Sequence, residues 1–310
     1  MIAASHFAVH TYPTQVALSK GLNVYMAKPP SVILITGCSS GIGFALAEAF
    51  HALGHVVYAT ARQVDANNSL AQNGLRVLEL DVTDPHSIAT AVEAVRNGSG
   101  RLDMLINNAG YGQGGAVMDL TADVLRQQFE TNVIAPVQLA RAFLPLMLSQ
   151  HQGRIVNIGS VSGVVTTPFA GAYCASKAAL HALSEAMRME LTPFGIDVIT
   201  VQPGKVISNV RERARERVSL PADSLYKPYI QHMENRARFS EQGAMPANAF
   251  ARQIIAALLA DVAPFVIRAG PLSVRMPLLQ CWLPRRVFDK RLRTLFGLKA
   301  DTSFTTDPTP

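Results

Sequence analysis

Short apolar runs alternate with longer helical patterns from residue 32 onward, and this alternation constrains the fold more than any other sequence feature. Seven runs have the length and composition of strands: Val32–Thr36, His55–Ala59, Leu75–Leu80, Leu102–Ile106, Arg154–Ile158, Asp197–Val201 and Pro264–Arg268. Helical patterns occupy residues 42–53, 85–97, 120–150, 170–192 and 246–260. Because the strand candidates are almost continuously apolar, they are expected to be buried on both faces. The sequence therefore predicts an α/β fold, with a doubly wound parallel sheet and helices on both faces.

The chain is predicted to form a single domain that is flanked by an N-terminal extension and a C-terminal tail. Residues 1–25 lack the basic start and apolar run of a signal peptide. Because Met26 reads like a natural protein start, residues 1–30 are predicted to be an N-terminal extension outside the core. Residues 31–270 carry the alternation, which residues 205–245 interrupt with a polar, arginine-rich stretch. We interpret that stretch as a substrate lid, since it falls at the carboxyl edge of the sheet. Residues 271–310 read as a basic amphipathic tail.

Charge and cysteine content limit the classes of binding partner and the cellular setting that are expected for this chain. The formal charge is −2 over residues 1–204 and +8 over residues 205–310, which favours an acidic ligand or an anionic membrane surface. Zinc-finger spacings, RNA-binding aromatic motifs and long basic tracts do not occur in the sequence, so no nucleic-acid partner is expected. Three scattered cysteines predict neither a disulfide framework nor a metal site, and they favour a reducing, cytoplasmic setting.

A glycine-rich loop follows the first predicted strand. The sequence from Thr36 to Gly43 has glycines at 37, 41 and 43, and a helical run begins immediately afterwards. Glycines allow a tight turn and a close approach to a pyrophosphate, which the N–H groups of the helix start can then bind. The alternative is that the glycines serve the turn alone.

The end of the second strand indicates which dinucleotide is preferred. Enzymes that use NAD usually place a carboxylate there to hold the ribose hydroxyls. No acid lies between Glu48 and Asp65, whereas Arg62 could pair with a 2′-phosphate. We therefore predict NADP(H) in preference to NAD(H). The alternative is that Arg62 is solvated and Asp65 reaches back to the ribose.

Four residues form a candidate catalytic set. Tyr173 and Lys177 are spaced i, i+4 in a helical stretch and share one face. A tyrosine with the ordinary pKa of about 10 is a poor proton shuttle, and a neighbouring ammonium favours its phenolate. Ser160 follows the fifth strand, where its hydroxyl can polarise a carbonyl; the alternative is a serine between glycines that only forms a turn. Asn132 is unfavourable in a helix interior, which indicates either a function such as holding a water or a helix bend.

The ordered combination of these motifs resembles the short-chain dehydrogenase/reductase family over residues 31–210. It rests on the glycine loop, Asp81 in LDVTD, the sequence Asn107–Gly110, Asn132, the Ser160/Tyr173/Lys177 set, and Pro203-Gly204. The resemblance implies a Rossmann-type fold, an oxidoreductase acting on CH–OH groups, Tyr173 as general acid/base, Lys177 on the nicotinamide ribose, Ser160 on the carbonyl and Asn132 on a water relay. It also implies cofactor contacts from Gly37, Ser39, Ser40, Gly41, Ile42, Gly43, Arg62, Asp81, Val82, Asn108, Ala109, Gly110, Tyr173, Lys177, Pro203, Gly204, Val206 and Ser208. Two positions depart from the pattern: Ser208 stands where a threonine is common, and Ser40 stands where NADP-preferring members often have a basic residue.

A narrower resemblance concerns the substrate. Tyr226–Tyr229, Met245–Ala251 and the stretch from Leu283 to Leu298 are similar to fungal NADPH-dependent 1-acyldihydroxyacetone-phosphate reductases. The likeness implies reduction of a hydrophobic, lipid-derived ketone bearing a phosphate, which Lys205 could meet together with Arg211, Arg213, Arg215 and Arg217. Alternating Glu212 and Glu216 favour instead a solvated, self-paired helix. Retinol or hydroxysteroid dehydrogenases match the first half of the chain equally well.

The basic tail and the assembly leave alternatives open. In the run 285–296 Val287, Phe288, Arg291, Leu292, Leu295 and Phe296 fall on neighbouring helical positions. This run, within residues 271–298, predicts either an interfacial helix in peripheral contact with a membrane or a helix that packs on the domain or on a dimer partner. Family resemblance implies homodimers formed through helices around 120–150 and 170–192. A non-catalytic NADP-binding sensor or scaffold is the alternative from another functional class.

Overall fold

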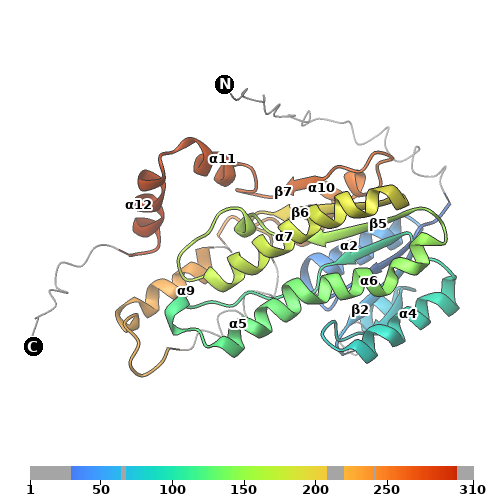
Figure 1. The fold of residues 1–310 in the computed structure, drawn as a ribbon, viewed down its shortest axis with the longest axis horizontal. Coiled ribbons are helices and arrows are strands. Elements are labelled where there is room, and N and C mark those ends of the chain that lie inside the picture. Colours follow the sequence, from blue (N-terminus) through green and yellow to red (C-terminus); the bar gives the residue numbers. More distant parts are fainter. Residues whose placement is uncertain (1–28, 64–67, 208–219, 240–241, 299–310) are drawn as a thin grey trace, which may run out of the picture. The chain divides into compact units, whose positions relative to one another are not determined.

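The computed structural model describes residues 29–63, 68–207, 220–239 and 242–298. Within these residues, seven parallel strands form one sheet in the order β3-β2-β1-β4-β5-β6-β7 (Figure 1). The strands are β1 (Val32–Ile35), β2 (Val56–Ala61), β3 (Arg76–Glu79), β4 (Met104–Asn107), β5 (Gly153–Ile158), β6 (Ile196–Pro203) and β7 (Val266–Ala269). The predicted doubly wound α/β fold class is confirmed, and each predicted strand overlaps an observed one.

Helices connect the strands and continue beyond the sheet. They are α2 (Gly41–Ala52), α3 (Asn68–Gln72), α4 (Pro85–Ser99), α5 (Ala122–Phe129), α6 (Ala135–Leu148), α7 (Gly171–Leu191), α9 (Ile230–Phe239), α10 (Ala247–Leu258), α11 (Arg275–Trp282) and α12 (Arg285–Leu295). Short 3₁₀ turns occur at η2 (Val117–Asp119), η4 (Val161–Gly163), η5 (Thr192–Phe194) and η6 (Lys227–Tyr229). A π-helical turn, η3 (Glu130–Ile134), joins α5 to α6, so the predicted helix over 120–150 is continuous and contains a π turn at Asn132.

Both faces of the sheet are buried, which explains why the strand sequences are apolar without alternation. In β1, Ile33 and Ile35 belong to one hydrophobic cluster, whereas Val32 and Leu34 belong to the cluster on the opposite face. Because neighbouring residues of a strand point to opposite faces, both must be apolar when helices cover both sides.

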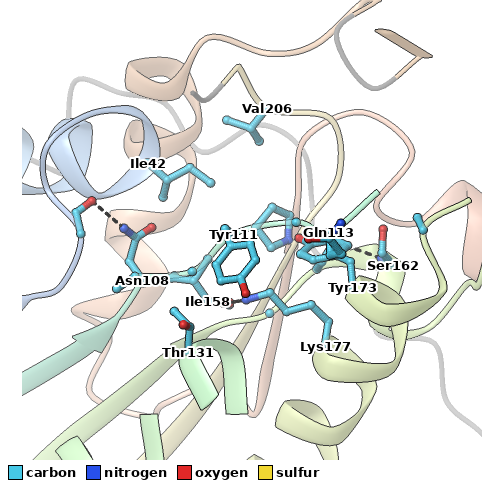
Figure 2. A pocket seen from close by; sticks show the side chains of 18 of the residues that line it. Ile42, Asn108, Tyr111, Gln113, Thr131, Ile158, Ser162, Tyr173, Lys177 and Val206 are labelled. Carbon is cyan, nitrogen blue, oxygen red and sulfur yellow. Dashed lines mark hydrogen bonds between the residues drawn. The ribbon is translucent and has the colours of Figure 1, made fainter. Parts of the chain in front are cut away.

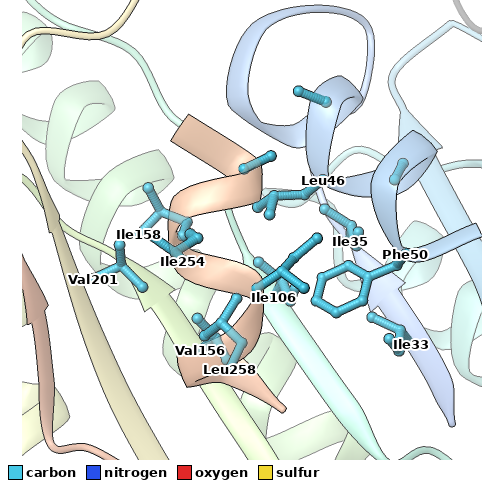
Figure 3. Packing of buried hydrophobic residues seen from close by; sticks show 14 of the residues in the cluster. Ile33, Ile35, Leu46, Phe50, Ile106, Val156, Ile158, Val201, Ile254 and Leu258 are labelled. Carbon is cyan, nitrogen blue, oxygen red and sulfur yellow. The ribbon is translucent and has the colours of Figure 1, made fainter. Parts of the chain in front are cut away.

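Helices α2 and α10 pack together on the first of these faces. Leu46 and Phe50 of α2 and Ile254 and Leu258 of α10 are buried against strand residues such as Ile106 (Figure 3). The other face is covered by α4 and α6, together with residues near the end of α7. One helical run, Ala122–Leu148, is long and apolar enough to span a membrane by length and composition, but half of its most apolar window is buried in this layer, as in the core helix of a globular domain.

The strand order reverses at β1, and this reversal positions the candidate site. β1 pairs with β2 on one side and with β4 on the other. The connections that leave the carboxyl ends of β1 and β4 therefore turn to opposite sides of the sheet and open a crevice between them, where ligands bind in folds of this type.

The region expected to be a lid is partly helical. Residues 208–219, which include Ser208 and the Arg211–Arg217 run, lie outside the described residues, as does Asp65. The described remainder contains η6 and α9, and Val206 forms a parallel bridge with Met245.

Candidate active site

A cavity of about 390 Å³ lies at the carboxyl edge of the sheet and receives most of the predicted site residues. Those that line it are Gly37, Ser39, Ser40, Ile42, Arg62, Asp81, Val82, Asn108, Ala109, Gly110, Ser160, Tyr173, Lys177, Pro203, Gly204 and Val206. Figure 2 shows Tyr173 and Lys177 on one side of the cavity and Ile42 and Val206 on the other. Residues from many separate elements are thus brought to one space.

Asn108 ties the glycine loop to the connection after β4. Its side-chain amide donates to the carbonyl oxygens of Thr36 at 2.8 Å and Gly37 at 3.1 Å. The Thr36 hydroxyl oxygen in turn accepts the N–H groups of Asn108 at 3.0 Å and Ala109 at 2.9 Å. These bonds hold two walls of the cavity at a fixed separation.

Two of the glycines are explained by this contact. A Cβ at Gly43 would lie 2.4 Å from the Asn108 amide nitrogen, and Gly37 combines a left-handed φ of 71° with a Cβ position 2.9 Å from the Ala109 Cα. Gly41 and Gly43 themselves are not among the cavity-lining residues. The glycines therefore serve close packing between loops as well as access to the cavity.

Arg62 and Asp81 lie at the end of the cavity formed by β2 and β3. Burial raises the pKa of Asp81, but hydrogen bonds from Thr83 and the positive charge of Arg62 outweigh this effect, so the pKa is lower than usual. The Asp81 carboxylate accepts the Thr83 N–H at 2.9 Å and the Thr83 hydroxyl at 2.7 Å. Asp81 is thus held ionised beside the Arg62 guanidinium.

Lys177 is a buried cation that lines the middle of the cavity. Its Nζ donates to the carbonyl oxygen of Ile158, the last residue of β5, at 2.7 Å. Burial lowers the pKa of this side chain to about 8. The ammonium form therefore prevails at neutral pH, although it loses its proton more readily than an exposed lysine does.

Ser160 is positioned by His181, a residue that the sequence reasoning missed. The Ser160 N–H donates to His181 Nε2 at 3.3 Å, and the Ser160 hydroxyl oxygen accepts the Ser162 N–H at 3.0 Å. With that lone pair engaged, the hydroxyl hydrogen remains available to a ligand. His181 follows Lys177 by four residues, so Tyr173, Lys177 and His181 form one stripe along α7.

The His181 ring fills the space that two glycines leave open. A Cβ at Gly159 would lie 2.2 Å from the imidazole Nε2, and one at Gly163 would lie 2.5 Å from Cε1. Burial, followed by the charges of Lys177 and Arg268, lowers the pKa of His181 to about 4. The ring is therefore neutral at physiological pH, as an acceptor at Nε2 requires.

Asn132 lies beneath the cavity instead of lining it. Its side-chain amide donates to the Tyr111 carbonyl oxygen at 2.9 Å and to the Ser176 hydroxyl at 3.1 Å, and its oxygen accepts the Tyr111 N–H at 3.1 Å. Gln128 supports the same loop by donating to the Tyr111 carbonyl oxygen and accepting the Gln113 N–H. Asn132 thus joins the cavity wall to α7 through its side chain, and its predicted water relay stays a prediction.

The remaining part of the cavity is mainly apolar. It is lined by Val165, Phe169, Met233, Phe239, Leu272 and Met276. Two cations, Lys205 and Arg236, also line it: Arg236 donates to the Thr167 hydroxyl at 2.8 Å, and the Lys205 ammonium lies 3.6 Å from the centre of the Phe239 ring. Lys205 was predicted as a residue that could meet an anionic group, whereas Arg236 was not, because nothing local in the sequence indicates that it lies beside Thr167.

Comparisons with known proteins identify the family. The short chain dehydrogenase model matches residues 31–219. A 3-ketodihydrosphingosine reductase from Bacteroides thetaiotaomicron is 34% identical over 276 residues, which cover 87% of this chain and 99% of the relative. An NADPH-dependent 1-acyldihydroxyacetone phosphate reductase from Saccharomyces cerevisiae is 30% identical over 285 residues, which cover 88% and 93%. A solved short-chain dehydrogenase from Streptomyces avermitilis gives a TM-score of 0.73 at 33% identity and covers 88% of this chain and 100% of that one. The chain belongs to the short-chain dehydrogenase/reductase family of oxidoreductases, and both predicted resemblances are confirmed.

Replacing His181 should separate its positioning role from its bulk. His181→Phe fills a similar volume but leaves the Ser160 N–H without an acceptor, so kcat should fall about tenfold, as expected for a lost buried hydrogen bond. His181→Gln retains an acceptor and should recover most of the activity. The measurement is kcat and KM for both variants with one ketone, and equal kcat values in the two variants would contradict the role.

The neutral state of His181 should also make stability depend on pH. The pKa of this imidazole lies near 6.5 when exposed and at about 4 in the folded protein. Because the unfolded chain takes up the proton first, this residue should reduce the free energy of unfolding by up to about 3 kcal/mol as the pH falls through that interval. Denaturant unfolding across the interval should show a steeper loss in the wild type than in His181→Gln. Parallel pH profiles would contradict the assignment.

Proposed function

We propose that this protein is an NADP(H)-dependent reductase or dehydrogenase that interconverts a ketone or aldehyde and an alcohol on a hydrophobic, lipid-derived substrate. A single observation carries the proposal. One cavity is lined by the glycine loop and Arg62 at one end, by Ser160, Tyr173 and Lys177 in the middle, and by apolar side chains at the other end. Such a cavity can hold a dinucleotide and an apolar carbonyl compound in contact.

The residues present fit a nicotinamide dinucleotide. The loop from Gly37 to Ser40 precedes the N–H groups at the start of α2, and the N-cap residue Ser40 makes no capping hydrogen bond with its side chain. Asp81 and Val82 would contact the adenine, while Lys177 would hold the nicotinamide ribose. When bound, the dinucleotide supplies or accepts the hydride, and the protein supplies position and proton transfer.

Proton transfer is assigned to Tyr173, with Lys177 and Ser160 as its supports. Lys177 places a positive charge one helical turn from Tyr173, which favours the phenolate in the deprotonated state of the cycle. Ser160 would donate its free hydroxyl hydrogen to the carbonyl oxygen and hold the carbonyl against Tyr173. In the direction of reduction, the Tyr173 hydroxyl gives its proton to the oxygen of the new alcohol.

Arg62 supports a preference for NADP(H). It lines the cavity at the end of β2, and its guanidinium acts on Asp81 through its positive charge. A 2′-phosphate at this end would pair with the planar guanidinium of Arg62, because arginine binds phosphate groups through two parallel hydrogen bonds. The Saccharomyces cerevisiae relative is described as NADPH-dependent.

The apolar end of the cavity supports a lipid-derived substrate. α9, which lies in the predicted lid region, contributes Met233, Arg236 and Phe239, so part of that region covers the substrate end. Lys205 and Arg236 would face an anionic group on such a substrate, in line with the phosphate in the name of the fungal relatives.

Assembly and compartment complete the proposal. We propose a homodimer through the helices around 120–150 and 170–192, supported by the exposed apolar side chains of Ile134, Leu183 and Met189. The three free cysteines are in keeping with a reducing, cytoplasmic setting.

Tyr173→Phe tests the catalytic assignment. The variant should lose about 10²–10⁴-fold in kcat, the usual contribution of a general acid, because the phenol proton is gone. NADPH affinity should change little, since the aromatic ring remains. Steady-state turnover of a ketone panel and NADPH binding by fluorescence measure the two quantities.

Tyr229→Phe is a matched control, since Tyr229 does not line the cavity and should retain full turnover. A Tyr173→Phe variant with wild-type kcat would contradict the proposed role of Tyr173 in proton transfer. A wild type that binds NADPH but turns over none of the ketones would instead identify a non-catalytic sensor or scaffold.

Arg62→Ala tests the cofactor preference. Loss of a charge-assisted pair with the 2′-phosphate should raise the KM for NADPH about tenfold or more and leave the KM for NADH nearly unchanged. Arg126→Ala, an exposed arginine on α5, is the control. A wild type that prefers NADH would overturn this part of the proposal.

A further inference from the structure

Helix α11 exposes an apolar face. Val274, Leu278, Leu279 and Trp282 are exposed, and Trp282 is 82% accessible, a value seldom found for a tryptophan in a folded domain. Their spacing places them, with exposed Arg275 and Cys281, on one side of the helix. We call these six residues the α11 face.

Helix α12, the element with the stronger amphipathic pattern, does not present its main apolar side to solvent. Phe288, Leu292 and Phe296 are buried with Val165 and pack against neighbours that include Phe239. The packing alternative is therefore the one observed for Phe288, Leu292 and Phe296. Besides Val287 and Leu295, α12 exposes a group of cations, the α12 cations: Arg285, Arg286, Lys290, Arg291 and Arg293.

The opposite side of α11 forms a wall of the cavity. Met276 and the preceding Leu272 line it, and neither belongs to the α11 face. Phe239 of α9, Met276 of α11 and the following Leu283 pack against the cluster that contains the buried side of α12. Figure 1 shows these three helices in the left half of the view. A single helix thus separates the apolar end of the cavity from an exposed apolar surface.

We propose that the α11 face and the α12 cations together dock the protein on an anionic lipid surface, with α11 lying at the interface and the apolar end of the cavity directly behind it. Trp and Leu side chains enter the interfacial region of a bilayer, and neighbouring Arg and Lys side chains bind anionic headgroups. Delivery of a lipid-derived ketone from that surface rests on the function proposed above, whereas the docking itself does not.

Charge favours a membrane over a second copy of the chain as the partner. Residues 271–298 contain six cations and one acid, Asp289, which already lies 3.6 Å from Arg285. A two-fold interface would bring this surface against itself, so that like charges would face each other. An anionic membrane complements the charge and accepts the apolar side chains in the same contact.

Trp282 is the only tryptophan of the chain, so tryptophan emission, excited selectively over the seven tyrosines, reports on this surface alone. Vesicles of equimolar phosphatidylcholine and phosphatidylserine should shift the emission of the full-length protein to the blue, and brominated acyl chains should quench it. Pure phosphatidylcholine vesicles should bind at least tenfold more weakly. An unchanged spectrum with the anionic vesicles would overturn the proposal.

Variants resolve the two components of the surface. Leu278→Ser combined with Leu279→Ser keeps the reporter and should weaken cosedimentation with the anionic vesicles about tenfold. Arg285→Gln combined with Arg286→Gln should reduce the preference for phosphatidylserine. Val262→Ser, the same kind of change at an exposed site between α10 and β7, should have no effect. Equal loss in Val262→Ser and in the leucine variant would overturn the assignment to α11.

Two further readouts separate this inference from the proposed function. Leu278 and Leu279 do not line the cavity, so their variant should reduce a short water-soluble ketone at the wild-type rate and a vesicle-bound ketone more slowly. Turnover of the soluble ketone without vesicle binding would reject docking and leave the function standing. Vesicle binding without turnover of any ketone would reject the proposed function and leave the docking standing. A blue shift that follows protein concentration without vesicles would identify a second copy as the partner and reject the membrane.

Discussion

The contact between the loops that follow β1 and β4 is the constraint on which the site depends. One amide side chain, Asn108, donates to two carbonyl oxygens of the glycine loop, and Gly43 leaves room for it. Because the strand order reverses between these two strands, the loops would otherwise diverge to opposite sides of the sheet. The hydrogen bonds fix the width of the crevice, and that width decides what the cavity can hold.

Helix α7 forms the other side of the cavity with side chains that recur every four residues. Residues spaced by four place a phenol, an ammonium and an imidazole along one face, at Tyr173, Lys177 and His181. Burial works in the same direction on the last two groups, since it lowers the pKa of each. The outcomes differ because the two groups start from different values: the lysine remains mostly charged at neutral pH, and the histidine remains neutral. One packing environment therefore supplies both a cation and a hydrogen-bond acceptor.

The apolar end of the cavity combines Val165 and Phe169, which precede α7, with segments that follow the motif-rich part of the chain. α9, the segment before α11 and α11 itself contribute apolar side chains to it, while α12 packs behind them. In this arrangement the helices that enclose an apolar cavity also form the outer surface of the protein. The opposite sides of α11 therefore face two apolar environments under the proposed docking, which explains why this helix is not clearly amphipathic in the sequence.

The fold class and the positions of the strands could be predicted from the sequence because burial on both faces leaves continuous apolar runs, and the glycine loop and the Tyr173–Lys177 pair could be found because their spacing is local. His181, Arg236 and the hydrogen bonds of Asn132 and Gln128 to Tyr111 could not, since each acts on residues distant in the sequence and only the packing of α5, α7, α9 and η3 brings them there. The tail shows the same division. Periodicity identifies an apolar side on α12, but whether that side meets protein, lipid or water depends on what lies opposite, and here Val165 and Phe239 cover it. Sequence determines which surfaces are apolar, whereas tertiary structure decides which of them remain exposed, because burial is a property of the neighbours and not of the residue.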